Sequence, residues 1–295
     1  MFDCFFVLCP SSLVLIGGAM ASVSREPMRL WEFGRRKIAD AFTDLGDLTL
    51  FGLSIFAGLR RRSSYNTIVP ICFSIGVGSI PVVMITGAFI GMVLAVQAYS
   101  EFHSLGLDTR LGRIISISVV RELGPVLAAV MLAGRVGSAI AAELATMRVT
   151  EQIDALSCLG TNPVHYLGTP RLIACVLLIP LLTILANFMG VLGGGMICID
   201  VYHIESHYYW ENTQGYVGLW DLITGLIKPT FFGVAIAVIC CHRGFYSEGG
   251  AEGVGRAATR AFVLSFIAIL VIDFFLAMFL NNLYDYLWPT STHLI

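Results

Sequence analysis

IVPICFSIGVGSIPVVMITGAFIGMVLAVQAY, residues 68–99, is a stretch of the sequence without a single charged side chain. A helix needs about 20 apolar residues to cross the ~30 Å hydrocarbon core of a bilayer, so this stretch is long enough to span a membrane. At ~1.5 Å per residue it exceeds one perpendicular crossing, and we expect Pro70 or Pro81 to break or tilt its first part. The stretch predicts an integral membrane protein.

Composition supports the same class. The chain has 295 residues, of which 57% are hydrophobic and 13% are charged, whereas about a quarter of a soluble domain is charged. Four more apolar segments follow the first, and each is read as a span: residues 114–143, 170–199, 219–241 and 260–284. The predicted fold is all-α, with an N-terminal interfacial amphipathic helix, five transmembrane helices and a short cytoplasmic helix.

The polar residue types exclude some functions. No basic run lies outside the first 62 residues, which argues against nucleic-acid binding. The eight cysteines form no CxxC pair and most lie in apolar segments, so we read them as small buried hydrophobes. His203 and His207 have the spacing of a metal pair, but a plain solvated loop is favoured because a third ligand is not evident.

The region before the first span is expected to lie at the membrane surface. Residues 31–62 carry an apolar stripe at helical spacing between two basic clusters, which suits the headgroup boundary of anionic lipid. The alternative, a poorly hydrophobic span, is disfavoured by Asp40, Asp44 and Asp47. The sequence divides into four parts: a doubtful extension (a signal-like segment or one that precedes the true start) at 1–24, the interfacial helix region at 25–67, the membrane domain at 68–284 and a tail at 285–295.

Charge in the loops predicts the orientation. Eight Lys and Arg residues precede the first span, and loop 200–221 contains none. The positive-inside rule therefore places the N-terminus in the cytoplasm and the C-terminus outside. Arg110 and Arg113, in a loop expected outside, oppose this assignment.

The segment RVTEQIDALSCLG, residues 148–160, predicts a short amphipathic helix between the second and third spans. Thr150 is expected to cap its N-terminus, and Gly160 suits the position after its C-terminus. Its apolar residues fall on one face: Val149, Ile153 and Leu156. The helix either rests on the headgroups or docks on an ATPase subunit, and amphipathicity alone does not separate the two.

These residues carry a resemblance. RELGPVLAAVMLAGRVGSAIAAELATMRVTEQIDALSCLGTNPVHYLGTPRLIA, residues 121–174, resembles the signature region of the MlaE/YrbE-type permeases, the membrane subunits of ABC transporters that work with MCE-domain proteins. The match extends through GAFIGMVLAVQAY (87–99), GLIKPTFFGVAIA (225–237) and GVGRAATRAFVLSFIAILVIDFFL (253–276), and it covers roughly residues 30–284.

The resemblance implies a homodimer in the bacterial inner membrane. Two copies of a cytoplasmic ATPase would bind ATP and Mg, while this chain has no cofactor and no Walker motif, and is not itself an enzyme. An MCE-domain protein would sit on the periplasmic face, and phospholipid or a related lipid would be moved. Segment 148–160 would be the coupling helix, with these contact residues: Arg148, Glu151, Gln152, Ile153, Asp154 and Leu156.

Ionisable residues inside spans are expensive and indicate functional sites. Lys228 and Asp273 lie at similar depth in antiparallel spans and are expected to pair, as a purely structural bridge or as part of a lipid site. The resemblance places RELGP near the dimer's lipid pocket, which favours Glu122 over Arg121 as its polar residue. Arg135 is expected to contact Glu143 or backbone carbonyls.

Small and interfacial residues complete the candidates. GxxxG spacing predicts close helix contact, either within the chain or between two copies of it, at these glycines: Gly87, Gly91, Gly134, Gly190 and Gly194. Gln97 and Tyr99 end the first span and are candidates for the mouth of the lipid pocket, although an aromatic belt also explains Tyr99.

Two other functions remain open at this point. A gradient-driven secondary transporter would use Lys228, Asp273 and Glu122 as an ion relay, but it needs no cytoplasmic docking helix, and five spans without an inverted repeat fit it poorly. A membrane-embedded lipid enzyme would need a catalytic cluster at the interface, and the sequence shows none.

Overall fold

The computed structural model describes residues 30–59, 65–104, 106 and 110–287, and these residues are almost entirely helical. The predictions for residues 1–24, for the basic cluster at 60–62 and for the last residues of the tail lie outside them. The chain divides into two units, residues 1–47 and 48–295. Helix α1 (Leu30–Gly58) begins in the first unit, which confirms a helix in this region, and its later residues Phe51 and Ile55 are buried in the second unit.

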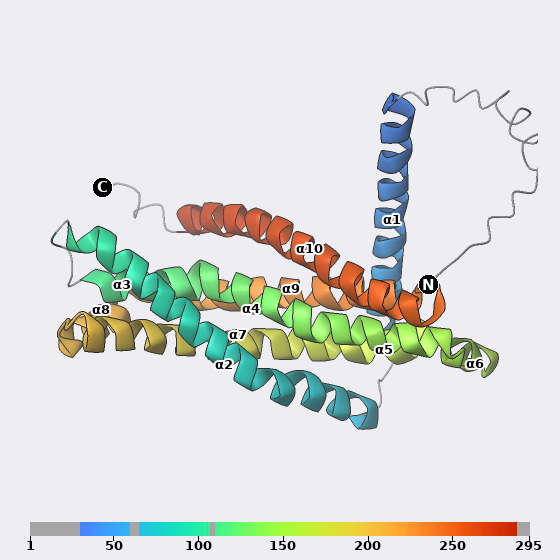
Figure 1. Ribbon diagram of the computed structural model, residues 1–295, viewed down its shortest axis with the longest axis horizontal. Coiled ribbons are helices and arrows are strands. Elements are labelled where there is room, and N and C mark those ends of the chain that lie inside the picture. The colour runs from blue at the N-terminus through green and yellow to red at the C-terminus, as the bar shows by residue number, and fades with distance from the viewer. Residues whose placement is uncertain (1–29, 60–64, 105, 107–109, 288–295) are drawn as a thin grey trace, which may run out of the picture. The chain divides into compact units, whose positions relative to one another are not determined.

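Five helical segments of the described chain are long and apolar enough to cross a membrane, as the sequence predicts (Figure 1). Each extends beyond its predicted span at one or both ends, because the helix continues past the most apolar residues: Thr67–His103, Leu111–Val149, Val164–Val201, Leu219–Phe245 and Gly250–Leu287. The first span was expected to break or tilt at Pro70 or Pro81, and the break is wrong, since α2 (Tyr65–His103) continues through both prolines; the tilt stays a prediction. Membrane helices tolerate proline where the surroundings satisfy the freed backbone groups.

The second span is interrupted twice by π-helical turns, which the sequence does not reveal. It consists of five consecutive pieces: α3 (Leu111–Ser118), η2 (Val119–Leu123), α4 (Gly124–Leu132), η3 (Ala133–Gly137) and α5 (Ser138–Val149). Two further π-helical turns, η4 (Val164–Gly168) and η5 (Ile197–Val201), flank α7 (Thr169–Met196). Such turns are rare and occur frequently at functional sites. Three charged residues of the second span lie in its two π-helical turns: Arg121 and Glu122 in η2, and Arg135 in η3.

The connections gather at two opposite ends of the second unit (Figure 1). The short helix α6 (Gln152–Cys158) lies at one end, together with the starts of α2 and α10 (Gly250–Leu287). Helix α8 (Ser206–Tyr216) lies at the other end, near α3. We call these the α6 end and the α8 end.

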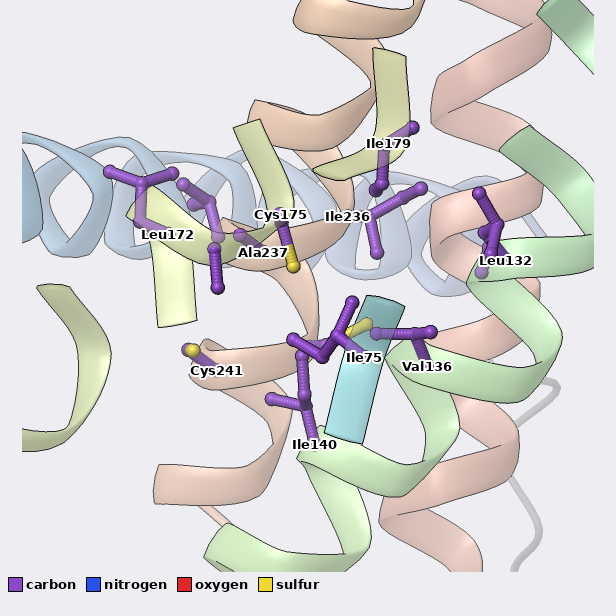
Figure 2. Close-up of a cluster of buried hydrophobic side chains, with 14 of the residues drawn as sticks. Ile75, Leu132, Val136, Ile140, Leu172, Cys175, Ile179, Ile236, Ala237 and Cys241 are labelled. Atoms are coloured by element: carbon purple, nitrogen blue, oxygen red, sulfur yellow. The ribbon is translucent and has the colours of Figure 1, made fainter. Parts of the chain in front are cut away.

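Helix α9 (Leu219–Phe245) packs against α7, α5 and α10, and α2 runs along α7. Figure 2 shows the apolar side chains that fill the space between α2, α7, α9 and the second span. The labelled members are small or branched: Ile75, Leu132, Val136, Ile140, Leu172, Cys175, Ile179, Ile236, Ala237 and Cys241. Their burial against one another positions the charged residues that lie on the same helices.

Glycine makes the contact between α2 and α7 possible. A Cβ atom on Gly87 would lie 2.5 Å from the carbonyl oxygen of Ala186, and one on Gly91 would overlap the carbonyl oxygen of Gly190. A Cβ on Gly194 would lie 2.9 Å from Ile115 Cγ2, whereas Gly134 has only an ordinary contact with a Phe262 ring. The GxxxG faces of α2 and α7 therefore pack on each other within one chain.

Helix α8 is anchored to the membrane helices by Tyr209. This side chain is 1% exposed, and its hydroxyl donates a hydrogen bond of 3.0 Å to the carbonyl oxygen of Val191. Burial raises the pKa of Tyr209 above its ordinary value, so the phenol stays protonated. Thr213 of α8 also accepts a hydrogen bond of 3.2 Å from Ser116.

Candidate functional site

Helix α6 is shorter than the sequence predicts. Helix α5 continues through Val149, so Arg148 and Val149 belong to α5 rather than to the short helix. The predicted cap by Thr150 is wrong, because its hydroxyl donates to the Thr146 carbonyl oxygen at the end of α5. Glu151 instead forms the corner, with φ of 59° in the left-handed region and no side-chain cap.

The end of α6 agrees with the sequence. Gly160 has φ of 72°, its N–H donates to the Ser157 carbonyl oxygen, and the Thr161 N–H donates to Leu156. This pair of hydrogen bonds is the Schellman arrangement, which needs glycine because other residues are strained at positive φ. The motif turns the chain away from α6 and into the third span.

One face of α6 is held by the membrane domain and the other is exposed. Ile153 is 4% exposed and Leu156 packs against the same core cluster. Arg148 and Asp154 form an exposed ion pair of 2.5 Å that joins α5 to α6. The exposed residues include Glu151, Gln152 and Asp154. Motion of this polar surface would therefore be transmitted to α5 through Ile153 and Leu156.

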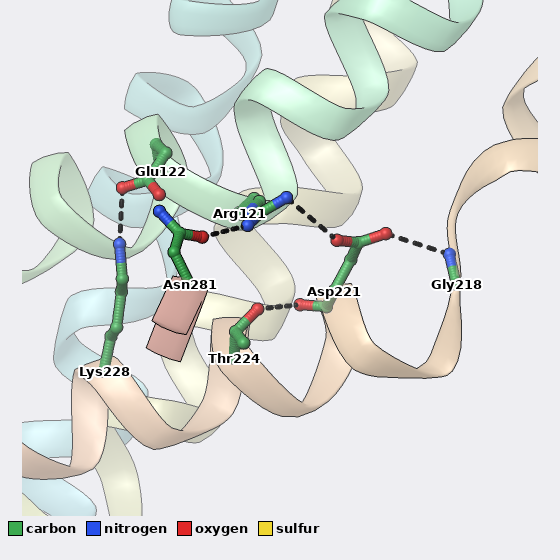
Figure 3. Close-up of polar contacts among 7 residues, drawn as sticks. All are labelled: Arg121, Glu122, Gly218, Asp221, Thr224, Lys228 and Asn281. Carbon is green, nitrogen blue, oxygen red and sulfur yellow. Dashed lines mark hydrogen bonds and ion pairs between the residues drawn. The ribbon is translucent and has the colours of Figure 1, made fainter. Parts of the chain in front are cut away.

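A second candidate site lies inside the membrane domain and is centred on Lys228 of α9. This side chain is almost fully buried, with 2% exposure. Its amine donates a hydrogen bond to Oε2 of Glu122 and lies 3.1 Å from Oδ1 of Asp273 on α10 (Figure 3 shows Glu122 and Lys228). The pairing of Lys228 with Asp273 agrees with their predicted depths. Three helices thus place one cation between two carboxylates, and we call these three residues the Lys228 cluster.

Arg121 lies beside the Lys228 cluster and has partners of its own. Its guanidinium donates to Oδ1 of Asn281 and lies 3.9 Å from Oδ1 of Asp221 (Figure 3). Asp221 also accepts a hydrogen bond from the N–H of Gly218 at the start of α9. Arg121 and Glu122, although adjacent, both reach α9, because their side chains diverge toward positions seven residues, about 10 Å, apart along it.

The members of the Lys228 cluster differ in access to the surroundings. The Glu122 side chain is 42% exposed and that of Asp273 is 21% exposed. A molecule that approaches the cluster therefore meets Glu122 before it meets Lys228.

An apolar cavity of about 540 Å³ lies next to η2, between α7, α8 and α9. Val120, Phe188, Leu222 and other apolar residues line it, and the amide of Asn187 enters the lining. Asn187 is 9% exposed, and its Oδ1 atom has no hydrogen-bond partner within the described part of the chain. Two of its lining residues, Val120 and Gly225, lie two and three residues from Glu122 and Lys228 on the same helices, although no member of the Lys228 cluster lines the cavity itself. The arrangement offers space for hydrocarbon with one polar contact.

Other predicted residues lie elsewhere. Gln97 is exposed on α2, and Tyr99 stacks on Tyr202, with ring centres 3.6 Å apart, and on His103. Tyr99 also packs against a second apolar cluster around Leu111, at the α8 end.

The prediction for Arg135 is wrong. Its guanidinium donates to the Ser79 hydroxyl at 2.5 Å, because Glu143, eight residues later on the same helix, is about 12 Å away along the axis. Glu143 pairs instead with Arg171 of α7 at 3.0 Å. Sequence reasoning missed Arg171 as an intramembrane charge, and the signal was its place as the second residue of the predicted span 170–199.

His203 and His207 lie in the connection between the third and fourth spans. Among the residues with described positions, no group of three His, Cys, Asp or Glu side chains could hold a metal ion. His207 forms an ion pair of 3.5 Å with Glu211 if it is protonated.

Comparison with known proteins gives a consistent result. The family model described as Permease MlaE matches residues 68–279. A probable ABC transporter permease protein of Synechocystis sp. is 46% identical over 254 residues, which cover 86% of this chain and 93% of the relative. One of Rickettsia felis is 42% identical over 82% of this chain and 93% of its own length. The chloroplastic protein TRIGALACTOSYLDIACYLGLYCEROL 1 of Arabidopsis thaliana is 39% identical over 69% of this chain and 58% of the relative.

Proposed function

This chain belongs to the MlaE permease family, and we propose on that premise that it moves phospholipid or a related lipid across or out of its membrane. It is a multi-pass membrane protein and the permease subunit of an ABC transporter. ATP hydrolysis therefore belongs to a partner subunit, and the gradient-driven alternative does not apply.

The observation that carries the lipid proposal is that the second span and α9 bear both the Lys228 cluster and part of the lining of an apolar cavity. A lipid has a polar headgroup and hydrocarbon chains, and the two features supply one kind of contact for each. The Arabidopsis relative supports the same class of cargo, since its name contains that of a glycolipid.

The exposure of each charge suggests how a headgroup would enter. Glu122 is the accessible member, so an incoming ammonium group of a headgroup would take the place of Lys228 as its partner. Lys228 would keep Asp273, at 3.1 Å, and would be free to donate to a phosphate oxygen. Arg121 is the lesser candidate because Asn281 and Asp221 already engage it.

Helix α6 is proposed as the surface that the ATPase moves. The polar face with Glu151, Gln152 and Asp154 would contact the ATPase, while Ile153 and Leu156 transmit the motion to α5. This places the α6 end in the cytoplasm, which agrees with the eight Lys and Arg residues before the first span. The N-terminus would then be cytoplasmic and the C-terminus periplasmic, in the inner membrane of a bacterium.

We also propose that the permease works as a homodimer with an MCE-domain protein at its α8 end. The outer faces of α2 and α10 support a large contact with lipid or a second copy, because they carry many exposed apolar side chains. The α8 end contributes an exposed surface that faces away from the proposed ATPase.

The first test is purification of the full chain from native membranes in mild detergent, followed by mass spectrometry of proteins and lipids. We expect an ATP-binding subunit, an MCE-domain protein and bound phospholipid. A chain that comes out alone and free of lipid would contradict the proposal.

The second test addresses α6 in reconstituted vesicles. Glu151→Lys and Leu156→Asp should abolish ATP-driven lipid transfer, either by loss of the ATPase or by hydrolysis without transfer. Cys158→Ser, a near-isosteric change at an exposed position of the same helix, is the matched control and should transfer lipid normally. Normal transfer by both charged variants would show that α6 is not the coupling element.

A further inference from the structure

A second cavity, lined by charged as well as apolar residues, lies at the α6 end of the membrane domain, in a region that the proposed lipid site does not use. It measures about 380 Å³ and is lined by α2, by the second span around η3 and by the start of α7. Ile75, Val136 and Ile140, which lie together in Figure 2, form its apolar wall. Two arginines and one carboxylate supply its charge: Arg135, Arg171 and Glu143. With these three groups ionised, the cavity carries a net charge of +1.

Arg135 is the cation without a counter-charge. It is exposed, and among the described residues its guanidinium donates to the neutral Ser79 hydroxyl and has no carboxylate within 4.0 Å. A Cβ on Gly78 would lie 2.8 Å from its Nη2 atom, so the guanidinium rests directly on the backbone of α2. The residue is held in place but its charge is not neutralised.

Arg171 is buried and fixed. Its side chain is 3% exposed, it lies 3.0 Å from Glu143, and it donates a hydrogen bond of 2.7 Å to the Leu167 carbonyl oxygen. The Glu143 side chain is 56% exposed, so the carboxylate reaches Arg171 from the open side of the cavity. A phosphate oxygen can approach Arg171 from the same side.

The depth of these residues matches the boundary between headgroups and hydrocarbon. The span Leu111–Val149 has 39 residues, about 58 Å at ~1.5 Å per residue, so a ~30 Å core centred on it begins about 14 Å from each end. Glu143 lies about 9 Å and Arg135 about 21 Å from the Val149 end, and Arg171 about 10 Å from the start of its own span. The cavity thus extends from headgroup level to several ångströms inside the hydrocarbon.

We infer that this cavity binds the phosphate of a lipid headgroup from the leaflet at the α6 end, with Arg135 and Arg171 as its ligands. A phosphate accepts hydrogen bonds from guanidinium groups in the two-pronged geometry that arginine favours. Arg135 supplies an uncompensated charge within the spanning segment, where an unpaired cation is costly. The exposed apolar side chains of α2 next to the cavity, Val69, Phe73 and Val77, provide a surface for the acyl chains of the same lipid.

The inference can be tested without transport. The full-length chain, with its co-purified subunits, is freed of excess lipid and titrated by native mass spectrometry with short-chain phosphatidylglycerol, with the matched diacylglycerol and with inorganic phosphate. Arg135→Gln should bind phosphatidylglycerol about ten-fold more weakly, the equivalent of 1.4 kcal/mol. Arg256→Gln is the matched control, because Arg256 is an exposed arginine of α10, paired with Glu252 and outside the cavity.

A variant that is expected to bind phosphatidylglycerol more tightly separates an effect on the site from simple misfolding, which could only weaken binding. Glu143→Gln removes the carboxylate that competes with a phosphate for Arg171, so it should tighten phosphatidylglycerol binding by about two- to five-fold, the range of an exposed ion pair. Arg135→Lys keeps the charge but loses the two-pronged geometry, and should fall between the wild type and Arg135→Gln.

Several results would overturn the inference: unchanged binding in Arg135→Gln, an equal loss in Arg256→Gln, or diacylglycerol binding as tight as that of phosphatidylglycerol. Displacement of phosphatidylglycerol by inorganic phosphate at equal concentration would retain the phosphate site and overturn the lipid as its source. If the chain binds phosphatidylglycerol as expected but transfers no lipid in the reconstituted assay, this inference stands and the result counts against the proposed function alone.

Discussion

Replacing Lys228 with methionine tests whether the Lys228 cluster acts as one unit. Methionine keeps the length of the buried stem and removes the amine, so the change leaves Glu122 and Asp273 facing each other without a cation. If the three side chains are one coupled unit, neutralising the carboxylates as well should undo most of the damage.

The structure sets the magnitude. At 3.1 Å and an effective dielectric constant of ~20, the attraction of Lys228 to Asp273 is about 5 kcal/mol before the cost of burying the amine is subtracted. Removing one partner of a buried pair typically costs about 3–5 kcal/mol. Glu122 is 42% exposed, so its surroundings can solvate it and reduce this cost. We therefore expect Lys228→Met to lower the free energy of unfolding by about 2–3 kcal/mol.

The assay is reversible unfolding in detergent–lipid micelles for the single variants and for the combination of Lys228→Met with Glu122→Gln and Asp273→Asn. We expect the triple variant to regain most of the lost stability, because it leaves no unpaired buried charge. It should still fail in lipid transfer, since the charges are proposed to contact the headgroup. If the losses in the free energy of unfolding simply add across the three substitutions, the three side chains are not one coupled unit. Normal lipid transfer by the triple variant would refute the role of the Lys228 cluster in binding the headgroup.

Three further predictions follow from packing and backbone geometry. Gly91→Ala should separate α2 from α7 and lower the free energy of unfolding by more than about 3 kcal/mol in the same assay, because the added Cβ would overlap the Gly190 carbonyl oxygen. Gly255→Ala is the control: it has open space around it and should be neutral or slightly stabilising. Gly160→Ala should cost about 1–2 kcal/mol through its positive φ and should increase hydrogen exchange in α6, with no change at α8. Burial raises the pKa of Tyr209 in the folded state, so the unfolded chain ionises first and the free energy of unfolding should fall as pH rises above about 10. Tyr209→Phe removes the hydroxyl: it should lower the free energy of unfolding by about 1 kcal/mol at neutral pH and show a smaller fall above about pH 10.

The spans could be predicted because their signal is local. An uncharged run such as residues 68–99 has one stable state in a bilayer, and loop charge counts suggest its direction. The depth of Lys228 and Asp273 is also a local property, and it was enough to predict their pairing in antiparallel neighbours.

Contacts between helices could not be predicted in the same way. GxxxG spacing indicated that Gly87 and Gly190 make close contacts but not that they face each other within one chain. Arg135 and Glu143 are close in sequence and were expected to pair, yet the rise of the helix separates them and brings Arg171 to Glu143 from another helix. The cap at Thr150 failed for a related reason, since α5 and α6 meet at a corner that only the positive φ of Glu151 reveals.

The two π-helical turns explain how one helix can serve two proposed sites. The span Leu111–Val149 reaches from the α8 end to α6, and Glu122 lies 27 residues, about 40 Å, from Val149. A rigid α-helix would pass any displacement of α6 to Glu122 undiminished. A π-helical turn widens the helix and weakens its regular hydrogen bonding, so η3 and η2 are the places where the span can change its bend or rotation. Because Arg135 lies in η3 and Glu122 in η2, such a change would move each charge relative to its partner on a neighbouring helix. The energy of ATP binding on the partner subunit would then reach the Lys228 cluster as a change in the geometry of one helix, without requiring the bundle to come apart.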